Sequence, residues 1–317
     1  MQRRIVSSFF LWSLFLTGFP IPILGQADGT SPPPPLGKLV DVGGYRVHLY
    51  CTGAGSPTVV IVGAGYSFDW GLVQSEVSKF TQVCSYDHSG IGWSGDGPKD
   101  SCDLRVNEVH AALKNVGIKG PYVLVGHSLG GLVARAYAEK YPEETVGIVF
   151  VDHAYQAGAG VGTMRPGILL RAPEGSYVAK SSPPVAGGVG PVGFGLQGDP
   201  NFSRLSAQDQ ELHRWFMTKE RDQKALQANL EIVPQCFADA DAAIKKHNHP
   251  LGDKPVVNVD TPDSAGTELQ KTLMSLSTNS KEMTAEKSGH FVIIDRPDVV
   301  IDAIGQVVQS TRNKTHL

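Results

Sequence analysis

The segment PYVLVGHSLGGLVARAYA occupies residues 121–138 and contains the pattern that decides the fold. Its first part, residues 122–125, is a short apolar run rich in β-branched side chains, which predicts a buried parallel strand. Residues 126–130 then fit Gly-x-Ser-x-Gly, and residues 131–140 have the composition of a helix. Glycines beside the serine allow strand and helix to approach closely across a sharp turn. We therefore predict that Ser128 is a nucleophile at the tip of a strand–turn–helix unit, rather than part of a plain turn.

Strands and helices are predicted to alternate on both sides of this segment. Apolar or alternating stretches predict further strands at residues 44–50, 56–62, 82–86, 146–152, 254–260 and 283–285. Helical composition or periodicity covers residues 70–80, 102–116, 269–276 and 297–310. Such alternation predicts an α/β fold with a mostly parallel sheet covered by helices on both faces.

The alternation is interrupted between residues 155 and 252. Residues 157–200 are rich in glycine and proline with little periodicity, and residues 206–247 have helical character. We interpret residues 155–252 as a cap or lid inserted into a core formed by residues 37–154 and 253–317. Apolar side chains in the insertion either line a substrate pocket or form the insertion's own small core. They are Phe194, Leu196, Phe202, Trp215, Phe216 and Met217.

The first residues have the features of a targeting segment. Two arginines precede an apolar run at residues 5–19, and small residues follow near position 25. This pattern predicts a signal peptide at residues 1–25 and a secreted or periplasmic protein with no stable membrane anchor after cleavage. An uncleaved anchor is the alternative. Residues 26–36 form a proline-rich linker.

Composition excludes some partners and leaves the cysteines open. The 317-residue chain has 41% hydrophobic residues and a net charge of −3, which gives no electrostatic case for nucleic acid. Export would permit disulfides, but the four cysteines allow three pairings and the sequence does not choose among them. Their spacings match no zinc site. The cysteines are Cys51, Cys84, Cys102 and Cys236.

Five motifs in order resemble those of α/β-hydrolase-fold enzymes, over about residues 37–312. They are VVIVGAG (59–65), YDHSGIGWS (86–94), GHSLGG (126–131), VFVDHA (149–154) and SGHF (288–291). The resemblance implies an eight-stranded, mostly parallel α/β-hydrolase sheet flanked by helices, with an inserted helical cap. No metal or organic cofactor is implied.

The resemblance also assigns roles to single residues. It implies that Ser128 is the nucleophile and that His290 is the base that takes its proton. One oxyanion N–H would belong to Leu129, directly after the nucleophile. The other would lie in the Gly63-Ala-Gly loop, where we choose Ala64 and keep Gly65 as the alternative. His290 is also supported by its own position, because it precedes the C-terminal amphipathic helix in a loop that can reach the sheet edge.

The acid that orients His290 has three candidates. Asp263 has the spacing usual in many family members, yet Thr261-Pro-Asp also forms a strong helix start that accounts for it. Asp260 lies in or at the end of a strand with no special reason to face the histidine. Asp152 ends the strand after the serine's helix, and no capping pattern explains it. We favour Asp152 and keep Asp263 as the second candidate.

A serine nucleophile excludes dehalogenases and epoxide hydrolases, which need a carboxylate to form their alkyl-enzyme ester. The chemistry that remains is acyl transfer to water, with a small-molecule carboxylic ester as the expected substrate. Two alternatives stay open. One is an aminopeptidase or amidase, whose substrate amine would bind acidic residues of the insertion: Glu231, Asp239 and Asp241. The other is a catalytically silent protein that uses the fold as a ligand pocket.

Overall fold

The computed structural model describes residues 32–153, 196–246, 249–262 and 268–317. The predicted signal peptide and residues 155–195 of the predicted insertion lie outside these ranges. The boundaries proposed for the signal peptide, linker, core and insertion therefore stay predictions.

The described residues form one eight-stranded sheet with the order β1-β2-β4-β3-β5-β6-β7-β8. The β1–β2 and β2–β4 pairs are antiparallel, and every other neighbouring pair is parallel. This confirms the predicted fold class, although the short β1 was not predicted. The strands are β1 (Lys38–Asp41), β2 (Arg46–Thr52), β3 (Thr58–Val62), β4 (Val83–Asp87), β5 (Tyr122–His127), β6 (Thr145–Val151), β7 (Val256–Asp260) and β8 (Ser280–Thr284).

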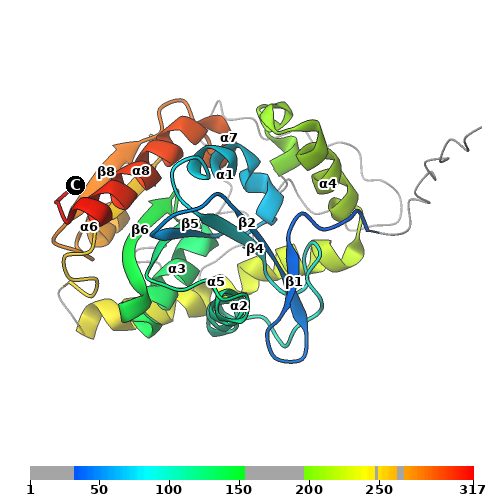
Figure 1. The fold of residues 1–317 in the computed structure, drawn as a ribbon, viewed down its shortest axis with the longest axis horizontal. Helices are drawn as coiled ribbons and strands as arrows, with labels where there is room; N and C mark the ends of the chain where they lie inside the picture. Colours follow the sequence, from blue (N-terminus) through cyan, green and yellow to red (C-terminus); the bar gives the residue numbers. More distant parts are fainter. Residues whose placement is uncertain (1–31, 154–195, 247–248, 263–267) are drawn as a thin grey trace, which may run out of the picture. The chain divides into compact units, whose positions relative to one another are not determined.

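Helices cover both faces of the sheet (Figure 1). One apolar cluster joins one face to α2 (Cys102–Asn115), α3 (Leu129–Lys140), α5 (Glu220–Lys246) and α6 (Glu268–Met274). A second cluster joins the other face to α1 (Gly71–Val77), α7 (Val292–Asp295) and α8 (Pro297–Asn313). Every residue of β3, β4 and β5 is buried, which explains why these strands are apolar runs without strict alternation.

The described part of the insertion packs closely against the core. Residues from the middle of α5, among them Val233 and Cys236, belong to the same apolar cluster as α2 and α3. Helix α4 (Ala207–Met217) supplies Leu212 and Phe216 to a third cluster, which also contains Tyr66. Leu196 and Phe202 are buried in the second cluster, and Trp215 and Met217 pack against the third. These contacts place the described side chains in apolar clusters shared with the core rather than in a small core of the insertion's own; Phe194 lies outside the described residues.

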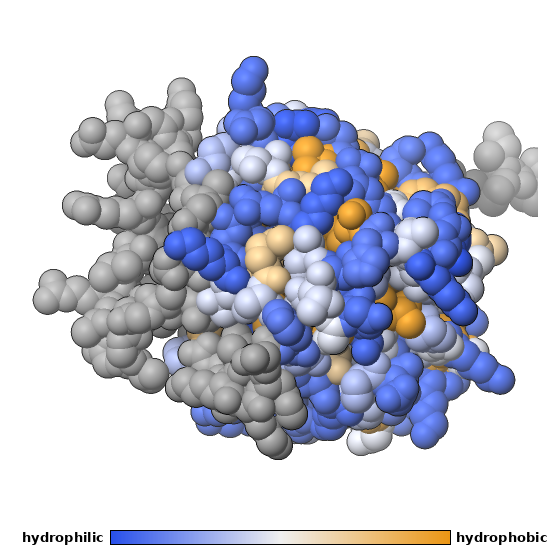
Figure 2. Space-filling model, turned by 90° about the vertical axis from the view of Figure 1, so that its left-hand side faces the viewer, coloured by the Kyte–Doolittle hydropathy of each residue, from blue (hydrophilic) through white to orange (hydrophobic). Residues whose placement is uncertain are grey.

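Polar residues dominate the surface on the side of the molecule where β8 forms the sheet edge. Figure 2 shows that hydrophilic side chains predominate there and that hydrophobic patches are small and separated. Lys281 and Glu282 of β8 are exposed, and charged side chains discourage pairing of an edge strand with another chain. Within the described ranges, no helix is both long and apolar enough to span a bilayer.

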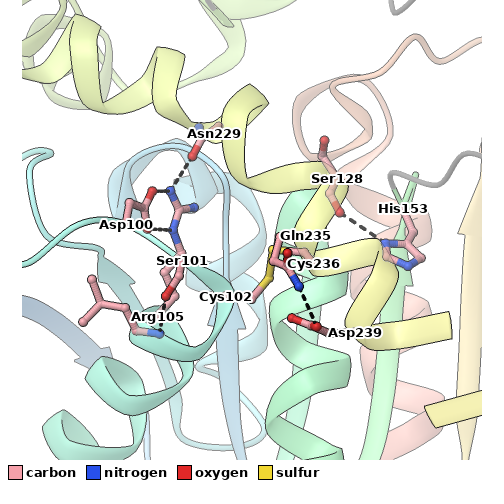
Figure 3. The surroundings of a disulfide bond; sticks show 11 residues. Asp100, Ser101, Cys102, Arg105, Ser128, His153, Asn229, Gln235, Cys236 and Asp239 are labelled. Atoms are coloured by element: carbon pink, nitrogen blue, oxygen red, sulfur yellow. Dashed lines mark hydrogen bonds and ion pairs between the residues drawn. A yellow bond between two sulfur atoms is a disulfide. The ribbon is translucent and has the colours of Figure 1, made fainter. Parts of the chain in front are cut away.

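Two disulfides select one of the three possible pairings. Cys51 and Cys84 face each other on the neighbouring antiparallel strands β2 and β4, with Cα atoms 4.0 Å apart. Cys102 and Cys236 join the start of α2 to α5 (Figure 3). The second bridge closes a loop with a sequence separation of 134 residues and ties the insertion's long helix to the core.

Candidate active site

Ser128 lies between β5 and α3, as the sequence predicted for this turn. Its backbone has φ 55° and ψ −126°, a conformation that costs a non-glycine residue about 1–3 kcal/mol and is concentrated at functional sites. The Ser128 N–H donates to the Val151 carbonyl oxygen at 3.1 Å, and Gly131 N–H donates to the Ser128 carbonyl oxygen at 3.0 Å. These bonds hold the strained turn against the neighbouring strand.

The glycines around Ser128 are required by close packing. A Cβ on Gly126 would lie 2.5 Å from the Gly130 carbonyl oxygen, and a Cβ on Gly130 would collide with the Val62 carbonyl. Gly130 therefore allows α3 to begin directly beside the end of β3. This contact brings the turn at residues 126–130, called the elbow below, next to the loop that begins at Gly63.

Asp152 follows β6 in a second unusual conformation. Its φ is 36°, in the left-handed region that aspartate tolerates better than most residues. Its N–H donates to the Val259 carbonyl oxygen at 2.8 Å, which fixes the residue at the carboxyl edge of the sheet. Its side chain is 15% exposed and reaches His290.

His290 lies in the loop between β8 and α7, and its Nδ1 is 2.6 Å from Asp152 Oδ2. The imidazole side chain is 49% exposed, so it is accessible from solvent. The loop is held by Asp295, whose Oδ2 accepts from Gly289 N–H at 2.8 Å. With Nδ1 bonded to the carboxylate, Nε2 is the nitrogen left to exchange a proton with another group.

His127 makes a contact that the sequence did not indicate. Its Nε2–H donates to the carbonyl oxygen of His290 at 2.7 Å, and the two ring centroids are 4.7 Å apart. Burial, followed by the neighbouring His290, lowers the pKa of His127 to about 4. His127 is therefore neutral at pH 7 and serves as a hydrogen-bond donor to the His290 loop. The sequence does not indicate this role, because a histidine beside a serine carries no signal of a contact 163 residues away.

His153 supports the elbow from the other side. Its Nδ1–H donates to the Ser128 carbonyl oxygen at 3.2 Å (Figure 3). A Cβ on Gly131 would collide with this ring, so glycine is needed there. Burial lowers the pKa of His153 to about 4, which keeps it uncharged at pH 7.

The two predicted oxyanion donors lie on adjacent elements. Leu129 is the first residue of α3, so its N–H has no acceptor within the helix. Ala64 lies in the loop after β3, beside the elbow. In the same loop the N–H of Tyr66 donates to Asp69 Oδ2 at 3.1 Å, so that donor is used within the protein.

The other two acid candidates have different surroundings. Asp260 ends β7, and its Oδ2 accepts from the side-chain amides of Asn258 and Gln270 in a buried cluster. Asp263 lies outside the described residues. Within the described ranges, no group of three His, Cys, Asp or Glu side chains is arranged to hold a metal ion.

Comparison with known proteins establishes the family. The alpha/beta hydrolase family matches residues 47–303, and this protein belongs to it. The chain is 32% identical over 121 residues to the uncharacterized protein YbdG of Bacillus subtilis, covering 37% of each chain. It is 32% identical over 128 residues to 2-hydroxymuconate semialdehyde hydrolase of Pseudomonas sp. (strain CF600), covering 38% of this chain and 44% of that one. For three such relatives, the matched part spans 36–48% of their length.

Solved structures show the same fold at low sequence identity. The epoxide hydrolase CorEH has a TM-score of 0.63 and 17% identity, covering 85% of this chain and 97% of that chain. Est816, described as an N-acyl homoserine lactone degrading enzyme, has a TM-score of 0.62 and 18% identity, covering 86% of this chain and 100% of that chain. At these identities the likeness establishes the fold alone.

Proposed function

We propose that this protein is a serine hydrolase that cleaves carboxylic esters through an acyl-enzyme on Ser128. His290 acts as general base, and Asp152 orients it. The observation that carries the proposal is the 2.6 Å contact between His290 Nδ1 and Asp152 Oδ2, in a loop that His127 ties to the elbow. The relatives named as hydrolases support hydrolytic chemistry.

The proposed mechanism follows from these positions. His290 Nε2 takes the Ser128 hydroxyl proton as the serine oxygen attacks the ester carbonyl. The negative charge that develops on the carbonyl oxygen is stabilised by N–H groups of Leu129 and the loop after β3. Collapse of this intermediate expels the alkoxide, to which His290 returns the proton. Water, deprotonated by His290, then releases the acid and restores Ser128.

We assign the orienting role to Asp152 rather than Asp263. A carboxylate bonded to Nδ1 keeps the imidazole in the tautomer whose Nε2 accepts a proton, and it stabilises the imidazolium that forms. Asp152 is in that position, whereas Asp260 is bonded to two side-chain amides. The contact between His290 and Asp152 therefore supports an orienting acid at the end of β6 rather than one after β7.

The test is hydrolysis of short and medium acyl p-nitrophenyl esters by the protein without residues 1–25. Turnover should disappear in Ser128→Ala. Asp152→Asn should lower kcat by about 10⁴-fold, while Asp263→Asn should leave most activity. If neither esters nor aminoacyl amides show Ser128-dependent turnover, the hydrolase proposal is wrong and a ligand-binding role takes its place.

We also propose export to an oxidising compartment. The two disulfides support this, because such bonds persist outside the reducing cytosol. Fractionation of producing cells, with thiol labelling of each fraction, tests the proposal: oxidised protein in the exported fraction is expected, and reduced cytosolic protein would contradict it.

A further inference from the structure

Asn229 of α5 contacts the backbone of the loop after β3. Its Nδ2 donates to the Ala64 carbonyl oxygen at 2.8 Å, and its Oδ1 accepts from Arg105 Nη2 at 2.6 Å. The orientation of this amide is unambiguous, because a guanidinium can only donate and a carbonyl oxygen can only accept. Asn229 therefore links the insertion's long helix to a loop beside the elbow.

Arg105 makes this link rigid. Its side chain is 1% exposed, and its Nε and Nη2 donate to the two carboxylate oxygens of Asp100 (Figure 3). A planar guanidinium paired with a carboxylate has little conformational freedom. Breaking this pair would leave a buried charge without a partner, which is energetically costly. The Asn229 amide is thus fixed at Oδ1 by Arg105, and its Nδ2 donates to the carbonyl oxygen of Ala64.

Holding that carbonyl also sets the direction of an N–H group. The Ala64 carbonyl and the Gly65 N–H belong to the same peptide unit, which is planar, so fixing one fixes the other on the opposite side. A hydrogen bond to the carbonyl also polarises the unit and strengthens its N–H as a donor. The next N–H along the chain, that of Tyr66, is already bonded to Asp69.

We propose that Asn229 is a positioning residue for the oxyanion hole, and that the donor it positions is the N–H of Gly65 rather than that of Ala64. This rests on the proposed acyl transfer at Ser128. Gly130 packs against Val62 and Gly63, so the loop begins beside the turn at Ser128. On this proposal the N–H of Gly65 and that of Leu129 flank one site. In this arrangement Asn229 acts through the peptide unit and does not touch the substrate.

Asn229→Asp is the direct test, because it keeps the oxygen that faces Arg105 and replaces the donor to Ala64 with a carboxylate oxygen. Gln235→Glu is the matched control: it makes the same change on the same helix, where Gln235 donates to the exposed Asp239 at 2.8 Å. Relative to that control, we expect kcat to fall about tenfold or more, since a misdirected donor stabilises the transition state poorly. KM should change by less than about threefold, because the interaction is made mainly in the transition state.

A second measurement does not depend on turnover. Hydrogen exchange followed by mass spectrometry should show faster exchange of the peptide that contains residues 63–66 in Asn229→Asp than in Gln235→Glu, with the sheet peptides unchanged. Asn229→Ala repeats both measurements if the aspartate variant does not fold.

The outcomes separate this inference from the proposed function. An Asn229 variant that retains the kcat of the Gln235 control overturns the inference while the ester-hydrolase proposal stands. Equal exchange of residues 63–66 in both variants overturns it as well. If the wild type has no Ser128-dependent turnover, the catalytic proposal fails, and with it the role of Asn229 in an oxyanion hole.

Discussion

Removal of the Cys102–Cys236 bridge should destabilise this protein more than removal of the Cys51–Cys84 bridge. A disulfide limits the unfolded chain more strongly when it closes a longer loop. The sequence separations are 134 and 33 residues. The chain-entropy relation then gives about 5 kcal/mol for the longer loop and about 4 kcal/mol for the shorter one. The longer bridge also holds α5, so its loss removes packing support as well.

The assay is equilibrium unfolding in guanidinium chloride, followed by circular dichroism without reductant. Wild type is compared with Cys102→Ala/Cys236→Ala and with Cys51→Ala/Cys84→Ala. Both double variants should have a lower free energy of unfolding, and the first should lose about 1 kcal/mol more than the second. A loss below about 1 kcal/mol for the first, or the reverse order, would refute the account of how α5 is attached.

Three further predictions concern His127, Gly130 and Asp199. His127→Phe removes the donor to the His290 carbonyl and should cost about 1 kcal/mol of positioning energy, about fivefold in kcat, measured on p-nitrophenyl esters. Gly130→Ala forces a Cβ onto the carbonyl at the end of β3 and should lower the free energy of unfolding by about 1–3 kcal/mol, whereas Gly305→Ala, in open space on α8, should raise it by about 0.5–1 kcal/mol. Burial, followed by the neighbouring carboxylate of Asp295, raises the pKa of Asp199 to about 6. Just below that pH the folded protein holds a proton on Asp199 that the unfolded chain has lost, so the free energy of unfolding falls as the pH rises toward 6. Asp199→Asn should therefore raise Tm more at pH 8 than at pH 4.5.

Each of these predictions has a clear contrary result. Unchanged kcat in His127→Phe would show that the bond to the His290 loop is dispensable. Equal stability of the two glycine variants would contradict the close approach at the elbow. A Tm gain that does not depend on pH would show that Asp199 does not titrate in this range.

The sheet could be predicted from the sequence because its signal is local. The strands at its centre are continuous apolar runs, and glycines mark the turn at Ser128. The short β1, Lys38–Asp41, gave no such signal, because four residues of mixed polarity form a strand only beside β2. The packing of α5 on α3 was likewise not predicted, because it depends on contacts between residues distant in the sequence.

Candidate site residues could be named from the sequence where one residue type in one pattern carries the chemistry. Ser128 and His290 were predicted from motif and chain order. The hydrogen bonds of His127 and Asn229 were not predicted, because they join residues distant in the sequence. An asparagine in the middle of an amphipathic helix has no periodicity or spacing that indicates a partner 165 residues away.

The central claim is that Ser128 is a nucleophile activated by His290. Reaction of the folded protein with a fluorophosphonate probe, followed by peptide mass spectrometry, tests it most directly and needs no knowledge of the substrate. We expect one adduct, on Ser128, that forms at least about 10³-fold more slowly in His290→Ala. No adduct, an adduct on another residue, or an unchanged rate in His290→Ala would contradict the account.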